Sequence, residues 1–537
     1  MQGPKPDGIS ALFLACVLLA GGSLVPATAA GRDNLLIGDL SAYWDYTERN
    51  YSETVLAGED AGAGAVVVPV QARTGDRRDY TVSPRLTLSS RGQTDLVELT
   101  YAPGFVYDDL RYTTRVDQSF SLTAEKHFTR RWFASFNDTY FLGNDPARET
   151  GLRTAEPVAS GNGQQQEQTS QEQIQEMQQV EDTGALDERV GSRRYWRNTA
   201  DFLAEYSYGE DSLAGAGYTF EVLRNSGSET RGYTEYDRHR FNAHLAHRFN
   251  AAWHLDVRGD YSKGIFNEPA VVAVTPGEGE EGQEELAADV VRPGSALSSD
   301  LREYIGAIRL DYAWSDHATV FAGDDSARTD YDDPLRLDNW THNLALGLDY
   351  YFNPRSYATL SGGPSFSKLG DQSWEVDYNV YGSYTRIYRH STLTAHISKS
   401  YDVQNFAGRG NGLTDTWEAG VDFTHSFTQN LSSVLFLSYR DDRRLQYPYT
   451  DTIVGVAGDV AEAAAAGDDL ETLAEGFDYH EKLFQAGFSL DYTFLRWYTF
   501  SGGYTYAKDE TGLVGGADYD EHRIFIRLAV SRDLFRW

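Results

Sequence analysis

Hydrophobic and polar residues alternate with a period of two along three successive runs between residues 95 and 142. In the last run, Trp132, Phe136 and Tyr140 occupy one set of positions, whereas Ser135 belongs to the other set. Because successive side chains of a β-strand point to opposite faces, this alternation predicts strands. One face of each run is apolar and aromatic, and the other is small, polar and charged. This combination is typical of a closed barrel wall with lipid outside and water inside.

The same alternation continues to the C-terminus and predicts about 20 strands, with 18 as the alternative count. Short connectors join the strands in pairs, and longer connectors separate the pairs. The sequence therefore predicts an all-β fold, a transmembrane antiparallel up-and-down β-barrel with short periplasmic turns and long extracellular loops. Closure also removes the unpaired edges that an open sheet of this size would expose. The expected strands and hairpins cover residues 35–47, 79–106, 115–142, 194–223, 236–264, 302–327, 338–367, 373–401, 414–440, 477–508 and 518–537.

Four long segments between the expected strands have the composition of loops. Residues 48–78 are rich in Gly, Ala and acidic residues, and residues 143–192 contain a glutamine-rich tract without aromatic residues. Residues 267–300 are acidic, and residues 441–476 include a stretch, 461–475, that favours one helix. Low-complexity polar tracts bury too little apolar surface to fold by themselves, so we expect loops here.

Aromatic residues recur at the ends of the expected strands. Amphipathic rings prefer the headgroup level of a bilayer, so this recurrence predicts two aromatic girdles around the barrel. The last strand alternates Ile524 and Ile526 with Arg523 and Arg527, and the sequence ends at Trp537. A terminal aromatic residue on an amphipathic strand resembles the signal that the outer-membrane assembly machinery recognises. The expected girdle residues include Trp132, Trp196, Trp253, Trp314, Trp374, Trp497, Tyr261, Tyr312, Tyr350, Tyr384, Tyr401 and Tyr439.

The N-terminal segment has the features of a cleaved secretory signal. Lys5 precedes an apolar stretch, residues 9–20, that is too short to span a bilayer, and small residues at 27–29 suit cleavage. We therefore divide the chain into a signal peptide, residues 1–29, and one outer-membrane β-barrel, residues 30–537. A secreted barrel of this kind is expected in the outer membrane, surrounded by lipid.

Composition and charge exclude several classes of function. Cys16 is the only cysteine and lies in the signal segment, so the mature chain has no disulfide and no thiolate chemistry. The formal net charge is −33, from 47 Lys and Arg against 80 Asp and Glu, which argues against a nucleic-acid partner. The sequence contains no Gly-x-Ser-x-Gly, His-Glu-x-x-His or phosphate-loop motif. We therefore predict no catalytic residues, no enzyme and no cofactor.

Two groups of residues have the chemistry of metal ligands. His239, His244 and His247 lie on one expected strand, but His244 faces opposite to the other two, so the three cannot converge. Residues 324–333 contain five aspartates, whose carboxylates suit Ca²⁺, but they lack the spacing of an EF-hand. We interpret residues 324–333 as a solvated loop and predict no metal site.

The chain resembles Gram-negative outer-membrane β-barrels and, more narrowly, the group known as beta-barrel porin 2. The resemblance rests on the runs at residues 80–88, 99–101 and 117–123 and on the hairpin at 128–132. Members of that group often accompany exopolysaccharide synthesis and export systems. The resemblance therefore implies polysaccharide export components as partners, and it implies no catalytic residues.

The inward face of the expected wall carries many charges. Arginines on the strands between residues 236 and 311 and carboxylates on later strands would give the lumen a basic arc and an acidic arc. Alternatively, these charges pair across strands and brace the wall, and the two interpretations are compatible. The expected lumen-lining residues are Arg238, Arg240, Arg248, Arg258, Arg309, Glu375, Asp377, Glu418, Asp422 and Asp491.

The expected turn near Asn250 predicts the register of one hairpin. If Arg248 and Ala252 are neighbours, Arg240 lies opposite Asp260. In the same register His244 lies opposite Asp256.

In that arrangement Arg258 and Arg309 have no acidic residue opposite them and are expected to face a water-filled lumen. We expect a passive channel or an export conduit. The alternative is a non-conducting structural or assembly component of an envelope complex, and a barrel enzyme ranks third.

Overall fold

The computed structural model describes residues 32–51, 76–110, 112–143, 194–226, 235–267, 300–332, 337–406, 412–445, 480–511 and 519–537. The predicted signal peptide, the glutamine-rich tract and the predicted helix at 461–475 lie outside the described residues. Most of the predicted long loops lie outside them as well.

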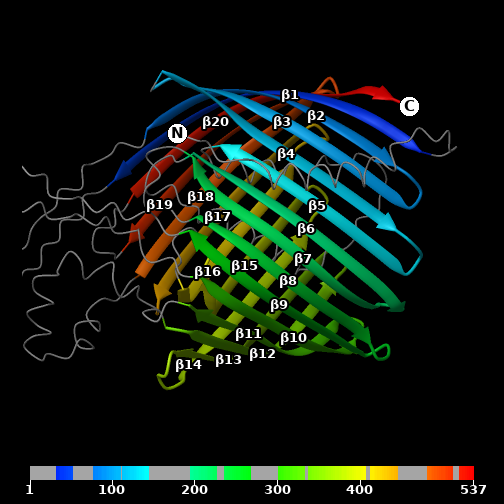
Figure 1. Cartoon of the computed structure of the whole chain (residues 1–537), viewed down its shortest axis with the longest axis vertical. Helices are drawn as coiled ribbons and strands as arrows, with labels where there is room; N and C mark the ends of the chain where they lie inside the picture. Colours follow the sequence, from blue (N-terminus) through cyan, green and yellow to red (C-terminus); the bar gives the residue numbers. More distant parts are fainter. Residues whose placement is uncertain are drawn as a thin grey trace, which may run out of the picture.

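The described chain forms a closed barrel of twenty antiparallel strands (Figure 1). Each strand pairs with its neighbours in sequence, and β1 closes the sheet by pairing with both β2 and β20. The predicted fold class and the count of 20 strands are therefore confirmed, and the alternative count of 18 is not. The strands are β1 Asp33–Tyr51, β2 Arg77–Arg91, β3 Asp95–Asp108, β4 Thr113–His127, β5 Trp132–Gly143, β6 Arg194–Gly209, β7 Ser212–Ser226, β8 Glu235–Arg248, β9 Trp253–Asn267, β10 Leu301–Ser315, β11 Ala318–Tyr331, β12 Asn339–Asn353, β13 Ser356–Leu369, β14 Glu375–Ile387, β15 Ser391–Gln404, β16 Gly412–Ser426, β17 Leu431–Arg444, β18 His480–Phe494, β19 Tyr498–Thr511 and β20 Tyr519–Arg536.

Every even-numbered strand from β2 to β18 ends at a short turn, and these turns share one end of the barrel, the short-turn end. Side chains shape several of them. Thr129 Oγ1, for example, accepts hydrogen bonds from the backbone N of Arg131 and Trp132. β1 begins and β20 ends at this same end, where Asn34 and Trp537 exchange two backbone hydrogen bonds. The opposite end, where the odd-numbered strands end, is the long-connector end.

The two faces of the wall differ in chemistry as the sequence predicts. One face exposes large apolar side chains such as Ile308, Leu346 and Leu360. Exposed aromatic residues lie at the strand ends on this face, among them Trp253 and Trp314. This is the arrangement of a wall that meets lipid with its outer surface.

Tyr401 departs from the predicted girdle. Its side chain is 8% exposed, whereas Tyr350 and Tyr439 are exposed. The carbonyl of Tyr401 accepts a hydrogen bond from Asn343 of β12, which is not a neighbour of β15 in the sheet. The sequence prediction failed here because the end of β15 no longer follows the wall.

Pro364 interrupts the pairing of β12 with β13, and a side chain of β14 supplies the missing hydrogen bond. Proline has no backbone N–H to donate, and the β12–β13 register is broken at Leu344. The side-chain amide of Asn379 of β14 donates to the backbone carbonyl of Leu344, with 2.8 Å between Nδ2 and O. The same nitrogen also donates to the Ser365 hydroxyl at 3.1 Å. The acceptor that proline leaves without a partner is thus satisfied by a side chain.

The turn between β8 and β9 corrects the predicted register. Asn250 Oδ1 accepts hydrogen bonds from the backbone N of Ala252 at 2.8 Å and of Trp253 at 3.1 Å, which holds a longer turn. Arg248 therefore lies opposite His254 rather than Ala252. The whole hairpin is shifted by two residues from the prediction. Because the side-chain period is also two, every side chain stays on its expected face.

The predicted acidic loop at residues 324–333 is also corrected. Strand β11 extends to Tyr331, so Asp324 and Asp325 lie within a strand and point to opposite faces. Among the residues that the structure describes, no group of three or more His, Cys, Asp or Glu side chains is placed to hold a metal ion. In the same part of the chain, no helix is long and apolar enough to cross a membrane.

Candidate functional site: the charged interior of the barrel

Contacts across the barrel identify the interior face of the wall. Phe406 follows β15, yet its ring contacts Tyr236 of β8 at 5.3 Å and Phe266 of β9 at 5.6 Å between centroids. Several strands separate β15 from β9, so this contact crosses the barrel, and the face that carries Tyr236 and Phe266 is the interior. Residues opposite each other in an antiparallel pair share a face, which extends the assignment around the wall. By this register the interior face carries Arg238, Arg240, Arg248, Arg258, Arg309, Glu375, Asp377, Glu418, Asp422 and Asp491.

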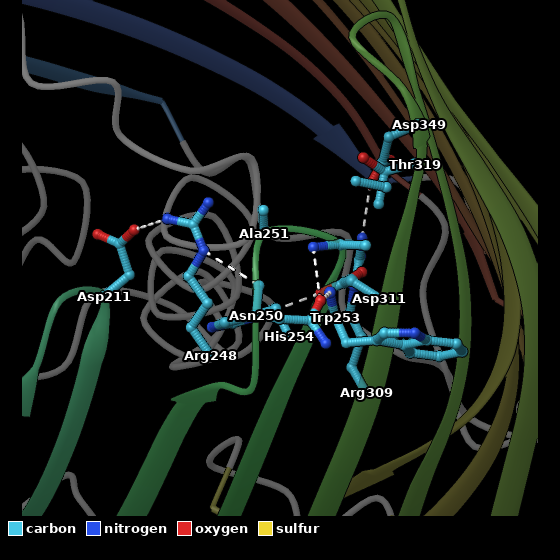
Figure 2. Close-up of a pocket in the computed structure, with 12 residues that line it drawn as sticks. Asp211, Arg248, Asn250, Ala251, Trp253, His254, Arg309, Asp311, Thr319 and Asp349 are labelled. Atoms are coloured by element: carbon cyan, nitrogen blue, oxygen red, sulfur yellow. Dashed lines mark hydrogen bonds and ion pairs between the residues drawn. The ribbon is translucent and has the colours of Figure 1, made fainter.

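Arg309 of β10 contacts three side chains near the short-turn end, of which Figure 2 shows Asp311 and Asp349. Its Nε donates to Asp311 at 2.8 Å, and its Nη2 donates to Asp349 of β12 at 2.5 Å. Its guanidinium lies 3.7 Å from the ring centre of Phe321. The other oxygen of Asp349 accepts a hydrogen bond from Thr359 at 2.7 Å. Arg309 is thus part of a network that spans four strands, β10 to β13.

A cavity of about 370 Å³ lies beside this network at the short-turn end. Arg248 and Asp211 form an ion pair on one side of it, and His254 Nδ1 lies 3.4 Å from Asp311 Oδ2 on the other (Figure 2). Arg248 Nε also donates to the backbone carbonyl of Asn250 at 3.3 Å. The cavity is therefore lined by charges of both signs from β8 to β12 and from two turns.

Two arginines that the sequence predicts to be unpaired have acidic partners. Arg258 Nε donates to Asp256, two residues earlier on the same strand, at 2.9 Å. Arg309 lies opposite Asp256 in the register and pairs with Asp311 and Asp349 as described. The prediction considered only residues directly opposite in one hairpin. It missed partners two residues along the strand and partners on more distant strands.

The other predicted pairs are formed in part. Arg240 and Asp260 do form an ion pair, with 3.0 Å between Nε and Oδ1, although they lie diagonally rather than opposite each other. His244 lies opposite Arg258, and its Nε2 is 3.2 Å from Glu205 of β6. A long side chain spans a diagonal position, so a register shift of two residues preserves the first pair but not the second.

Carboxylates on the later strands are only partly neutralised. Asp377 pairs with Lys399, and Glu418 accepts from His396 Nε2 at 2.9 Å. Within the described residues, Glu375, Asp422 and Asp491 have no cation within ion-pair distance. The interior arginines of β8 to β10 are thus neutralised by acids, whereas Glu375, Asp422 and Asp491 add negative charge to the interior of the later strands.

A second ion-pair network lies near the long-connector end beside the β1–β20 seam. Asp45 of β1 lies directly opposite Asp79 of β2, and both are almost completely buried. Arg523 of β20 donates to Asp45 at 2.7 Å, and Arg115 of β4 donates to Asp79 at 2.8 Å. Arg77 donates to Asp79 at 2.7 Å. Like charges opposite each other repel, so these arginines are what makes the pair of carboxylates tolerable.

Several interior residues escaped the sequence analysis. Asp349 was detectable, because Leu346 and Leu348 mark the outward positions of its strand and place Asp349 inward. Asp211 lies in a turn, where a period of two gives no information about direction. Phe406 follows a strand and crosses the barrel, and no local pattern predicts that contact.

No protein-family model matches the chain. No curated protein matches it either. Among solved structures, the chain is similar to the siderophore receptor PirA from Pseudomonas aeruginosa, with 9% identity, 93% of this chain and 80% of that chain covered, and a TM-score of 0.45. It is also similar to the outer membrane protein opdK from the same organism, with 9% identity, 93% and 99% covered, and a TM-score of 0.37. OccK3 (OpdO) of P. aeruginosa gives 11% identity, 93% and 96% covered, and a TM-score of 0.37. Likeness at these identities and scores concerns the barrel fold and carries no argument about function.

Proposed function

We propose that this protein is an outer-membrane channel that lets polar solutes cross passively. The observation that carries the proposal is the division of the wall, with exposed apolar side chains on its outer face and ion pairs and carboxylates on its inner face. A closed wall satisfies its backbone groups internally, which a hydrocarbon environment requires. A barrel dissolved in water would need the reverse arrangement, with polar side chains outside and apolar side chains inside.

The strand number supports an aqueous passage. Barrels of eight strands are filled by their own side chains, whereas barrels of 16 to 18 strands leave a water channel. The twenty strands here enclose more space than those, and many interior positions are short polar residues such as Ser119, Thr219 and Ser361. Such a lining hydrates a passage and does not fill it.

The charge balance of the interior supports a preference for cations. The arginines of β8 to β10 named above form ion pairs, whereas Asp422 and Asp491 form none within the described residues. Unpaired carboxylates that line a pore attract cations and repel anions. This replaces the expectation of an unpaired basic arc opposite an acidic one.

Planar bilayer recordings test the proposal. Purified protein should give stepwise conductance, and its reversal potential in a salt gradient should have the sign of cation preference. The double variant Asp422→Asn, Asp491→Asn should shift the reversal potential toward zero, because it removes two lumen charges. The matched double variant Asp33→Asn, Asp371→Asn should leave it unchanged, because Asp33 is exposed at the start of β1 and Asp371 is exposed in the connector between β13 and β14. Absence of any conductance from correctly folded protein would refute the channel and favour the non-conducting structural component.

The solute class is a separate step of the proposal. The sequence resemblance to the exopolysaccharide-associated group supports a conduit for polysaccharide that works beside export components and is inserted by the outer-membrane assembly machinery. Release of size-fractionated dextrans from liposomes that contain the protein tests the conduit directly. Conductance of small ions without dextran release would limit the protein to a general porin.

A further inference from the structure

The last residues of β15 leave the barrel wall on one side. β15 pairs with β14 up to Lys399, which lies opposite Val380 in the last pair. Residues 400–404 continue to pair with β16, and residues 375–379 of β14 pair with β13 alone. β14 and β15 therefore separate at the long-connector end. We call residues 399–406 the inward tip.

The inward tip bends into the barrel. The backbone carbonyl of Tyr401 accepts a hydrogen bond from Asn343 Nδ2 of β12 at 3.1 Å. Asn343 belongs to the interior face, because it lies opposite Ser365, which shares its face with Asp377. Tyr401 is therefore over the inner surface of the wall and no longer within it.

Asn405 fastens the inward tip to β10 and β11, which lie five and four strands away from β15 along the wall. Its Nδ2 donates to Glu303 Oε1 of β10 at 2.8 Å and to Thr329 Oγ1 of β11 at 3.0 Å. Its Oδ1 accepts from the hydroxyl of Tyr331 at 2.5 Å. Both amide protons and the amide oxygen are used, so the position of this side chain is fixed from three directions.

Phe406 packs beside Asn405 into an aromatic site. The Arg238 guanidinium lies 4.0 Å from its ring centre, Phe266 stacks on it, and Tyr236 meets it edge to face. Gly264 makes room for the ring, since a Cβ at that position would lie 2.7 Å from Phe406 Cε1. Phe406 is 6% exposed. The Phe406 ring is thus closely packed on several sides, which indicates a specific contact between the inward tip and the wall.

Lys399 secures the point where the inward tip departs. Its side chain is 5% exposed, pairs with Asp377 of β14 and lies 3.0 Å from Asp415 of β16. It lies 4.6 Å from the ring centre of Tyr378 and donates to the Tyr378 carbonyl at 3.4 Å. One cation thus joins the two strands that have separated.

We propose that the inward tip narrows the passage at the long-connector end and sets the size limit for solutes. The tip occupies space inside the wall and is attached to β8–β11 by the side chains of Asn405 and Phe406 and to β12 by the carbonyl of Tyr401. This inference rests on the proposed channel function, because it assigns the residues that decide which solutes that channel admits. Glu303 and Arg238, which hold the tip, form an ion pair of 3.2 Å with each other, so the constriction carries charges of both signs.

Single-channel recordings with polyethylene glycols of graded size test the tip. The double variant Asn405→Ala, Phe406→Ala removes its attachments to β8–β11 and should raise conductance and admit larger polymers. Phe525→Ala removes an interior ring of β20 that stacks on Tyr43 of the neighbouring strand β1, away from the inward tip, and this matched control should change neither. A double variant that is folded and keeps the wild-type conductance and polymer cut-off would overturn the proposal.

A cross-link gives a readout that does not depend on conduction. Cys16 is the only cysteine of the chain and lies in the predicted signal segment, so an introduced pair reacts without competition. Asn405→Cys with Thr329→Cys should be joined by a short bifunctional thiol reagent in the folded barrel, because the two native side chains are 3.0 Å apart. A failure to cross-link would show that the tip does not reach β11 and would overturn the inference even if the protein conducts. A cross-linked tip without any wild-type conductance would refute the channel and leave the placement of the tip intact.

Discussion

At the scale of single residues, the interior of this barrel is organised by how its carboxylates are neutralised. Asp45 and Asp79 are buried opposite each other and are tolerated because arginines from three strands contact them. Arg309 illustrates the converse, a cation held by two carboxylates and an aromatic ring. In both places, removal of one partner leaves buried charge without compensation.

We expect Arg309→Met to lower the free energy of unfolding by about 1.5–3 kcal/mol, the range for hydrogen bonds that involve charged groups. Asp311 and Asp349 would remain next to each other without their shared cation. Arg248→Met is the control. Its side chain is 39% exposed and that of its partner Asp211 is 61% exposed. This pair should therefore contribute less than about 1 kcal/mol. Urea unfolding in lipid vesicles measures both variants, and equal losses would contradict the assigned difference.

At the scale of elements, a side chain of one strand supplies a hydrogen bond that is missing between two neighbouring strands. Pro364 interrupts the β12–β13 ladder, and Asn379 of β14 supplies the donor that Leu344 O requires. A period-two pattern identifies these strands correctly but gives no sign of this repair, because it depends on three strands at once. The side chain of Asn379 thus does what a backbone N–H does elsewhere in the wall.

Asn379→Ala should lower the free energy of unfolding by about 1–3 kcal/mol, the cost of a buried acceptor without a partner. Pro364→Ala gives the backbone a donor at that position. In the Pro364→Ala background, loss of the Asn379 amide should therefore cost less. Comparison of the single and double variants by urea unfolding measures this coupling. Strict additivity would show that the amide and the missing N–H are unrelated.

The sequence predicted the strands well where they pair within the barrel sheet. It predicted poorly the residues that depart from the sheet. Each hairpin expected between residues 194 and 508 does contain one short turn, and Gly209, Asn250, Asn353 and Thr428 mark four of these turns locally. The β8–β9 register was wrong by two residues because the hydrogen bonds of Asn250 lengthen the turn. Phe406 and Asn405 were not predicted, because their partners are distant in sequence and share no period with them.

At the scale of the whole molecule, closure depends on the seam between β1 and β20. Backbone pairing extends along the length of both strands, with one irregularity at Leu36. Arg523 reinforces the seam by reaching Asp45 and the hydroxyl of Tyr43 on β1. Arg536 makes a similar pair with Asp33 at the short-turn end, but both side chains are more than half exposed.

Arg523→Met should weaken the closed barrel by about 3 kcal/mol, the lower end of the range for a broken buried pair, because Arg77 remains 3.9 Å from Asp45. Arg536→Met, on the same seam, should leave stability unchanged. The measurement is the temperature at which the fast-migrating folded form disappears on electrophoresis without boiling. A closed barrel that resists detergent should show such a form. A protein whose mobility never depends on heating would contradict the barrel itself.

The separation of β14 from β15 also determines where the surrounding bilayer has to end. Beyond the Val380–Lys399 pair, toward the long-connector end, no described strand pairs with residues 375–379 of β14 on the side away from β13. An open edge of this kind does not occur in contact with hydrocarbon, because its N–H and C=O groups would find no partner there. Tyr378, whose ring lies over the Lys399 ammonium, is suited to the headgroup layer. We therefore expect the hydrocarbon layer on this side of the barrel to end at the level of Val380, where β14 and β15 separate.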